Sequence, residues 1–69
     1  MNLKIEIDRE EDGRWIAAVP ELPGVHVYGQ TRDQAIAKVE SLALRVIADR
    51  LEHGEPIPEA ASAFTIVSA

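Results

Sequence analysis

The first nineteen residues show a period of two in their polar and apolar positions. Every second residue from Leu3 to Ile7 is apolar and the residues between are charged, which is the pattern of a strand with one buried face. The Asp12-Gly13 pair that follows predicts a tight turn. Residues 14–19 predict a second strand, in which Trp15, Ala17 and Val19 fall on one face and Ile16 and Ala18 on the other, and Pro20, which has no backbone N–H to donate, ends it. These residues therefore predict an antiparallel hairpin.

The next segment predicts a stiff connector and a third strand. Residues 20–24 contain two prolines, each of which restricts its own backbone and that of the residue before it. Residues 25–28 alternate again and favour a short strand, which Gly29 ends.

A helix is predicted from a capping box to a glycine. The Thr31 hydroxyl can accept the Gln34 N–H while the Gln34 side chain returns to Thr31, and His53-Gly54 favours the helix end. The apolar residues fill an arc of about 200°, more than one sheet face would use. They are Ala35, Ile36, Val39, Leu42, Ala43, Leu44, Val46, Ile47 and Leu51. Lys38, Ser41, Arg45, Asp49 and Glu52 form the opposite, solvated side.

A final β-favouring run at residues 64–67 completes the pattern. Three meandering strands, a crossover helix and a fourth strand predict one α+β domain over residues 1–69, a β-β-β-α-β two-layer sandwich. A chain of 69 residues buries a thin core, and without cysteine it has no disulfide to reinforce that core. We therefore expect self-association into a dimer or tetramer, through the second apolar side of the sheet or the helix.

The charge balance indicates the kind of partner. A formal net charge of −5 opposes binding to phosphate backbones, so a basic protein is a better partner than nucleic acid. The alternative is that mild acidity only keeps a small protein soluble. The sequence has neither a signal-peptide pattern nor an apolar run of membrane-spanning length, and we expect a cytoplasmic protein that does not bind membranes.

The sequence predicts no enzyme, cofactor or metal site. It has no glycine-rich phosphate loop, no nucleophile elbow and no zinc-ligand spacing. The acids at residues 8–12 fit a solvated hairpin better than a cation site. His26 is a lone strand histidine without a positioned partner, and His53 fits a helix end.

Candidate partner contacts each have a structural alternative. Trp15 can belong to the core or to an interface, and Leu22 can be a rigid apolar tip or fold inward. Glu40 and Arg50 project into the apolar arc of the helix, where they either extend past the core rim or pair with another subunit. The residues selected as candidate contacts are Trp15, Pro20, Glu21, Leu22, Pro23, Tyr28, Glu40 and Leu44.

Several motifs in order resemble the HicB antitoxin family across nearly the whole chain. They are Asp12-Gly13-Arg14-Trp15, Val19-Pro20-Glu21-Leu22-Pro23-Gly24, Gly29-Gln30-Thr31, Ala35 and Leu51-Glu52-His53-Gly54-Glu55-Pro56-Ile57-Pro58. Val25 stands where the family often has cysteine, and Gln30 where it often has aspartate.

The resemblance implies a degenerate ribonuclease-H-like fold without nuclease activity. It also implies self-association and neutralisation of a small basic HicA-type RNA-cleaving toxin by direct binding. Many family members carry a further C-terminal DNA-binding segment; because this sequence stops at Ala69, we expect no direct DNA binding. The alternative is a solitary, self-assembling structural or regulatory protein without a toxin partner.

Overall fold

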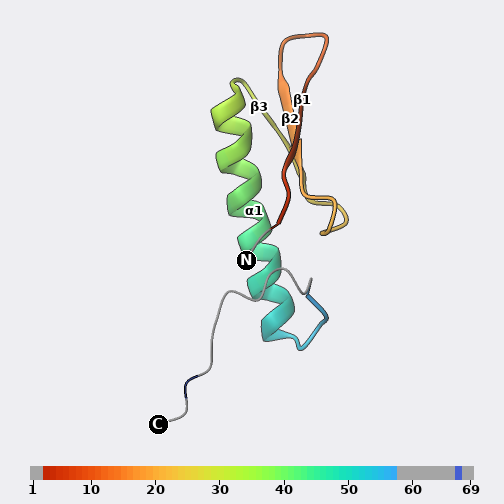
Figure 1. The fold of residues 1–69 in the computed structure, drawn as a ribbon, viewed down its shortest axis with the longest axis vertical. Helices are drawn as coiled ribbons and strands as arrows, with labels where there is room; N and C mark the ends of the chain where they lie inside the picture. Colours follow the sequence, from red (N-terminus) through yellow and green to blue (C-terminus); the bar gives the residue numbers. More distant parts are fainter. Residues whose placement is uncertain (1–2, 58–66, 68–69) are drawn as a thin grey trace.

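Three strands and one long helix make up the fold (Figure 1). The computed structural model describes residues 3–57 and residue 67, and in these the strands are β1 (Glu6–Arg9), β2 (Trp15–Ala18) and β3 (His26–Gly29). They form one antiparallel sheet in the order β1-β2-β3. The helix α1 (Arg32–Glu52) lies against one face of this sheet, which confirms the predicted two-layer α+β architecture.

The predicted strands are present with shifted ends. Leu3 and Ile5 precede β1, but the period of two holds, because both pack half-buried against the core while Lys4 is exposed. β3 begins one residue later than predicted and includes Gly29, which the sequence had suggested as a stop. The predicted fourth strand at residues 64–67 lies outside the described residues except for Val67, which is exposed and has no regular secondary structure.

The core lies between the sheet and one stripe of the helix. Alternate strand residues face α1, and helix residues four apart face the sheet, as the two periods require. The buried side chains among the described residues are Ala17, Val19, Leu22, Val25, Ala35, Val39, Ala43 and Ile47. Most of these are small, so the helix approaches the sheet closely and the core is thin, as predicted.

The hairpin between β1 and β2 closes through backbone and side-chain hydrogen bonds. The Glu10 N–H donates to the Arg14 carbonyl (2.7 Å), and the Gly13 N–H donates to the Glu10 carbonyl (3.0 Å). Gly13 has a φ of 92°, a conformation that favours glycine. The Asp12 carboxylate accepts hydrogen bonds from the Arg14 N–H (3.0 Å) and the Arg14 Nε (2.7 Å). The turn is therefore held by Asp12 as well as by the backbone.

The helix begins at the predicted residue but with a different cap geometry. Thr31 is the N-cap, and its hydroxyl accepts the Gln34 N–H (3.1 Å), as predicted. The Gln34 Oε1 accepts the N–H of Gln30 (2.6 Å), so the prediction that this side chain returns to Thr31 was wrong by one residue. Two otherwise unpaired backbone donors are still satisfied, which is the purpose of such a cap.

Gly29 allows the first turn of the helix to touch the sheet. A Cβ at this position would lie 2.5 Å from the Ala35 backbone nitrogen and 2.8 Å from the Ala35 Cα. Both are backbone atoms, so a side chain at residue 29 would push α1 away from β3.

The chain turns back after the helix. His53 is the C-cap, Gly54 has a φ of 68°, and the Glu55 N–H donates to the Arg50 carbonyl (2.8 Å). Ile57 then packs half-buried against the core. In the part of the chain that the structure describes, no helix combines the length and apolar character needed to cross a membrane.

Candidate protein-binding site

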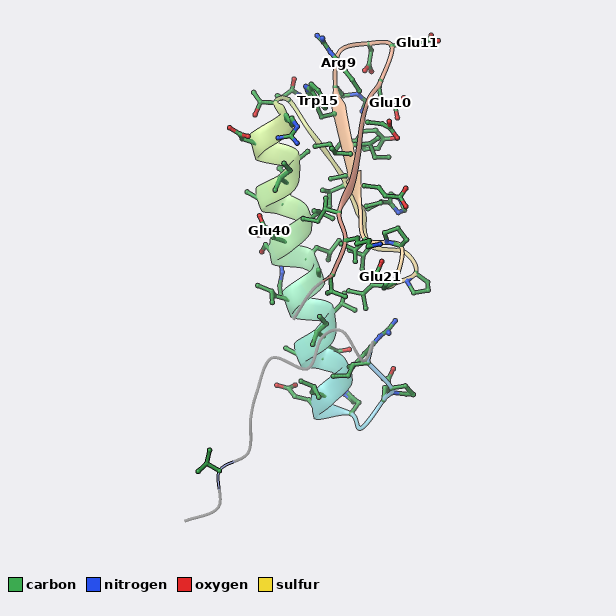
Figure 2. All side chains as sticks on the ribbon, viewed as in Figure 1. Arg9, Glu10, Glu11, Trp15, Glu21 and Glu40 are labelled. Atoms are coloured by element: carbon green, nitrogen blue, oxygen red, sulfur yellow. The ribbon has the colours of Figure 1, made fainter. Side chains whose placement is uncertain are left out.

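The predicted contact residues lie in separate parts of the fold. Pro20, Glu21, Leu22 and Pro23 form the connector between β2 and β3, at the opposite end of the sheet from the hairpin (Figure 2). Glu40 and Leu44 lie on one flank of α1. Trp15 and Tyr28 lie on β2 and β3. The structure therefore unites only some of these residues.

Leu22, in the middle of the connector, is not an exposed tip. Its side chain is 1% exposed and belongs to the core, so the structure selects the inward alternative and Leu22 is no surface contact in this fold. The Leu22 N–H donates to the Val19 carbonyl (3.0 Å), and the Val25 N–H donates to the Leu22 carbonyl (3.0 Å). These two turns direct the Leu22 side chain into the core at the connector end of the sheet, where burial of its apolar surface is favourable.

The exposed part of the connector is tied to the N-terminal segment through Glu21. Pro20, Glu21 and Pro23 are exposed. The Glu21 Oε2 accepts the backbone N–H of Lys4 (3.0 Å), which holds the residues before β1 against the connector.

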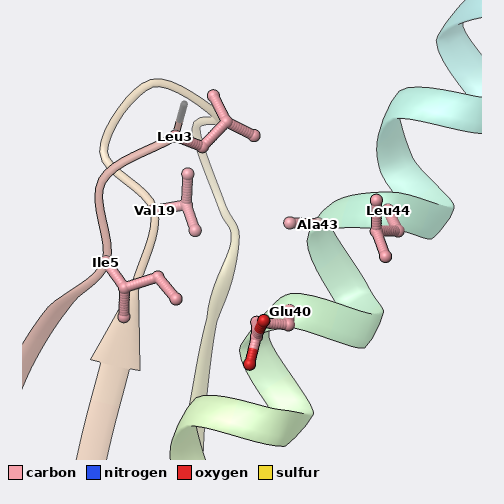
Figure 3. A pocket seen from close by; sticks show the side chains of 6 residues that line it. All are labelled: Leu3, Ile5, Val19, Glu40, Ala43 and Leu44. Carbon is pink, nitrogen blue, oxygen red and sulfur yellow. The ribbon is translucent and has the colours of Figure 1, made fainter. Parts of the chain in front are cut away.

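A groove lies between these N-terminal residues and the helix (Figure 3). We call it the edge groove; its lining residues are Leu3, Ile5, Val19, Glu40, Ala43 and Leu44. Its volume is about 170 Å³. This is below the roughly 300 Å³ at which small-molecule pockets begin, so the groove suits one or two side chains of a protein partner.

Among the described residues that line it, the edge groove has an apolar floor and one charged side chain, that of Glu40. Val19 and Ala43 are buried beneath it, and Leu44 is 55% exposed at its rim. Glu40 is exposed, and Figure 3 shows its carboxylate at the groove between α1 and the N-terminal residues. A partner that inserts an apolar side chain beside a lysine or arginine would satisfy both features.

Glu40 and Arg50, the two charged residues predicted to project into the apolar arc of the helix, have different environments. Arg50 is half-buried, and its guanidinium donates to the Pro56 carbonyl (3.5 Å), so its stem crosses the core rim as the first alternative requires. No hydrogen bond joins the Glu40 side chain to residues 53–57, the described part of the chain directly after the helix, and Glu40 lines the groove instead. Only Glu40 therefore stays a candidate for contact with another chain.

The two aromatic candidates lie on opposite faces of the sheet. Trp15 is half-buried against the core, with the Arg9 guanidinium carbon 5.8 Å from the centre of its ring. Tyr28 is 42% exposed on the face away from the helix, with the Arg14 guanidinium carbon 4.4 Å from its ring centre. Cation–π contacts of this kind hold each arginine over a fixed surface.

Two groups of ionisable side chains lie away from the edge groove, one at the hairpin and one at the end of the helix. Hydrogen bonds from the Arg14 backbone, and then from its guanidinium, hold the pKa of Asp12 below its usual value of 3.8. At the helix end, Asp49, His53 and Glu55 bring possible metal-ligand atoms within 4.8 Å of one another, but all three are exposed. His53 Nδ1 lies 2.8 Å from the Asp49 carbonyl oxygen, a contact that fits a helix end.

The sequence-based selection missed most of the groove lining. Leu3, Ile5, Val19 and Ala43 are ordinary core positions in the period-two and helical patterns. The sequence feature that could have indicated the groove was the width of the apolar arc of the helix, because this arc is wider than the stripe of the helix that the sheet buries. Leu44 and Leu51, at one edge of that arc, are 55% and 54% exposed.

Comparison with known proteins identifies the family to which this arrangement belongs. Residues 3–69 match the family described as the HicB_like antitoxin of bacterial toxin-antitoxin systems. The chain belongs to the HicB-like antitoxin family. The match spans the sheet, the connector and the helix, which confirms the resemblance inferred from the motifs.

Curated relatives of this HicB-like chain come from archaea and a cyanobacterium. It is 31% identical over 58 residues to a UPF0150 protein of Thermoplasma acidophilum, covering 84% of each chain. It is 33% identical to a UPF0150 protein of Archaeoglobus fulgidus over 80% of this chain and 83% of the relative. It is 37% identical to a UPF0150 protein of Synechocystis over 88% and 86%. No solved structure gave a significant match.

Proposed function

We propose that this HicB-like protein is the protein-binding module of a type II toxin-antitoxin system. In this proposal it neutralises a small basic HicA-type RNA-cleaving toxin by binding it directly. The observation that carries the proposal is the edge groove, an apolar surface with one carboxylate at its rim. Membership of the antitoxin family supplies the class of partner.

The charge of the whole protein supports a basic partner. Its formal net charge is −5, which attracts a basic protein over distance and speeds the encounter. Glu40 then provides a local acceptor for a lysine or arginine of the toxin, beside the apolar contact of Leu44. Long-range attraction and local pairing thus favour the same class of partner.

A catalytic role has no support in the described residues. His26 lies on β3 and His53 ends α1, so the two histidines come from separate elements. The antitoxin family likewise points to a regulatory protein. We propose that the module acts without a cofactor, in the cytoplasm, where an RNA-cleaving toxin meets its substrate.

The experiment is a binding titration with a purified HicA-type toxin from the same genome. We expect a stable complex of fixed stoichiometry and loss of RNA cleavage by the bound toxin. Glu40→Lys should weaken binding by about tenfold or more, the cost of reversing one close charge pair at an interface. Glu52→Lys makes the same charge change on the solvated side of α1 and serves as the matched control.

Two outcomes would contradict the proposal. Toxin that cleaves RNA equally well in the presence of excess HicB-like protein would exclude neutralisation. Equal weakening by Glu40→Lys and Glu52→Lys would show that the edge groove is not the contact, and that only net charge matters.

A second function is favoured by the surface outside the groove. Leu51 is 54% exposed, and among residues 3–57 the helix packs on one face of the sheet only, which suits a solitary self-assembling regulatory protein. This function predicts a homo-oligomer that binds no toxin. The titration above separates the two functions.

A further inference from the structure

A second groove lies on the other flank of α1, between the helix and the neighbouring strand β3 (Figure 1). We call it the β3 groove; its lining residues are Val27, Ala37, Lys38, Ser41, Leu42 and Arg45. Its volume is about 490 Å³, against about 170 Å³ for the edge groove. The β3 groove therefore has room for several side chains of an extended segment.

The β3 groove carries positive charge in a protein that is acidic overall. Lys38 and Arg45 are exposed at its helix side, and Val27 and Leu42 are half-buried at its floor. None of the described residues that line it has a carboxylate, and within residues 3–57 neither cation forms an ion pair. The edge groove has the opposite charge, that of Glu40. The two flanks of α1 therefore suit different partners.

The outer edge of β3 has free backbone groups. β3 is last in the sheet order, so within the described residues no strand pairs with its outer side. The Val19 N–H donates to the Val25 carbonyl (3.0 Å), which makes these two residues a hydrogen-bonded pair next to the β2–β3 ladder. Such pairs recur at every second residue, so the next one on β3 is at Val27. The backbone N–H and C=O groups of His26 and Tyr28 therefore point outward, away from β2.

A lysine at this edge selects what can pair with it. The Lys38 Nζ extends from α1 and donates to the Tyr28 carbonyl (3.4 Å), as an outward-pointing carbonyl allows. A lysine over a sheet edge opposes pairing with a neutral or basic strand. A carboxylate on the incoming strand removes this obstacle, because it accepts the Lys38 ammonium and frees the Tyr28 carbonyl for backbone pairing.

We propose that the β3 groove binds an extended acidic segment of a partner protein, which adds to the sheet as an antiparallel strand beside β3. Every second side chain of the segment then faces α1. A central apolar residue packs on Val27 and Leu42, and the carboxylates two residues before and after it meet Lys38 and Arg45. These cations are two helical turns apart, about 10 Å, and the two carboxylates are about 13 Å apart along a strand, a difference that long side chains span.

A peptide fits this groove better than nucleic acid. Two cations are a small footprint for a phosphate backbone on a protein of net charge −5. The free edge of β3 also requires a partner with peptide N–H and C=O groups. The proposal adds a second, acidic partner to the antitoxin function and does not depend on the toxin.

The first test is a binding titration with the purified full chain. The probe is a labelled peptide, capped at both ends, of the sequence Thr-Glu-Thr-Val-Thr-Glu-Thr. Fluorescence anisotropy should give a dissociation constant on the order of 10–100 µM, because a single short strand buries less area than a standard interface. The same peptide with lysine in place of glutamate should bind at least about tenfold more weakly.

A second control separates backbone pairing from charge. In the antiparallel arrangement the two threonines beside the valine lie opposite His26 and Tyr28 and donate their N–H groups to the edge. N-methylation of these two threonines removes the donors and keeps both carboxylates. It should weaken binding by about tenfold or more.

Arg45→Glu tests the groove from the side of the protein. It should weaken binding of the glutamate peptide by about tenfold or more and strengthen binding of the lysine peptide, because the local charge is reversed. Arg32→Glu makes the same change at the start of α1, outside the groove, and should alter neither affinity appreciably. Circular dichroism of both variants establishes that they are folded.

Amide hydrogen exchange locates the bound peptide. The N–H groups of His26 and Tyr28 should exchange about tenfold more slowly when the glutamate peptide is saturating, because they become paired. The Val27 N–H already faces β2 and should change less.

Four results would overturn the proposal. They are no binding of the glutamate peptide, equal binding of the lysine or N-methylated peptide, equal effects of Arg45→Glu and Arg32→Glu, and His26 and Tyr28 amides that are protected before peptide is added. The last result would show that another part of this chain, or a second copy, already occupies the edge. Tighter binding of a single-stranded RNA that Arg45→Glu abolishes would assign the groove to phosphates instead. None of these measurements uses the toxin, so their failure leaves the antitoxin proposal standing.

Discussion

The two faces of the three-stranded sheet differ in what covers them. On β2, Ala17 faces α1 and is fully buried, whereas its neighbours Ile16 and Ala18 face away and are half-buried. The covered face carries apolar side chains from small Ala17 to large Trp15, whereas the face away from α1 combines Ile16 and Ala18 with the charged residues Glu6 and Asp8. The buried contacts are therefore concentrated on one face of the sheet.

Because the core lies on one face of the sheet, the exposed residues of the proposed partner-binding site lie outside it. Core residues reach the edge groove only as its floor, through Val19 and Ala43, and the exposed side chains at the groove are those of Glu40 and Leu44. Glu40 and Leu44 are exposed, so substitutions there should change the proposed toxin binding and leave folding intact. The predictions below test this separation, beginning with the largest effect.

Two leucines provide the most direct test. Leu22→Ala should lower the free energy of unfolding by about 2–5 kcal/mol, because the side chain is 1% exposed and its removal leaves a cavity. Leu44→Ala should cost less than about 0.5 kcal/mol, because Leu44 is 55% exposed. Chemical denaturation measures both. Similar losses from the two variants would mean that the covered core does not end where the structure places it.

The close contact between β3 and α1 can be tested at Gly29. Gly29→Ala should cost about 1–3 kcal/mol, because its Cβ would meet backbone atoms of Ala35 that cannot move independently. Gly13→Ala is a useful control, since no atom lies within 4 Å of its added Cβ and only the positive φ opposes it. Thermal unfolding of both variants should place Gly29→Ala lower. The reverse order would show that helix and sheet have room to separate.

The cap of α1 should contribute a smaller amount. Thr31→Ala removes the acceptor of the Gln34 N–H and should lower the free energy of unfolding by about 1 kcal/mol. Thr31→Ser keeps the hydroxyl and should retain most of this stability. Equal destabilisation by the two substitutions would indicate that the methyl group, rather than the hydrogen bond, is responsible.

The smallest effect is expected at the hairpin, outside the covered core. The pKa of Asp12 is lowered in the folded state by hydrogen bonds from Arg14, so its contribution to stability is present above its usual value of 3.8. That contribution is lost as the pH falls through the lower folded-state pKa. A carboxyl chemical-shift titration should give a midpoint below 3.8, and Arg14→Ala should raise it. A wild-type midpoint at or above 3.8 would contradict the contact.

Local patterns predicted most of the fold because local physics determines it. The alternation from Leu3 to Ile7, the turn at Gly13 and the cap at Thr31 each depend on residues close together in sequence. The strand ends were less accurate, because pairing across the sheet decides them. Gln34 bonding to Gln30 instead of Thr31 is an error of the same kind, since the entry angle of the chain decides which donor is within reach.

The candidate site was predicted only in part. Glu40 and Leu44 were selected from their places on the helical wheel, and the structure brings both to one groove. Leu22 was selected because two prolines would hold the connector in one conformation. Prolines do not determine whether the leucine side chain points to solvent or into the core. The hydrogen bonds at Val19 and Val25 turn its side chain into the core.

The sequence alone determined the period of each element, the acidic charge and the family, because each is a property of neighbouring residues or of their sum. The tertiary structure decided which part of the broad apolar arc of α1 the sheet covers. Four residues one turn apart became buried, while Leu44 and Leu51 remained at the surface. A flat sheet can cover only one stripe of a cylinder, and which stripe it covers depends on the contact at Gly29 and on the direction of the helix.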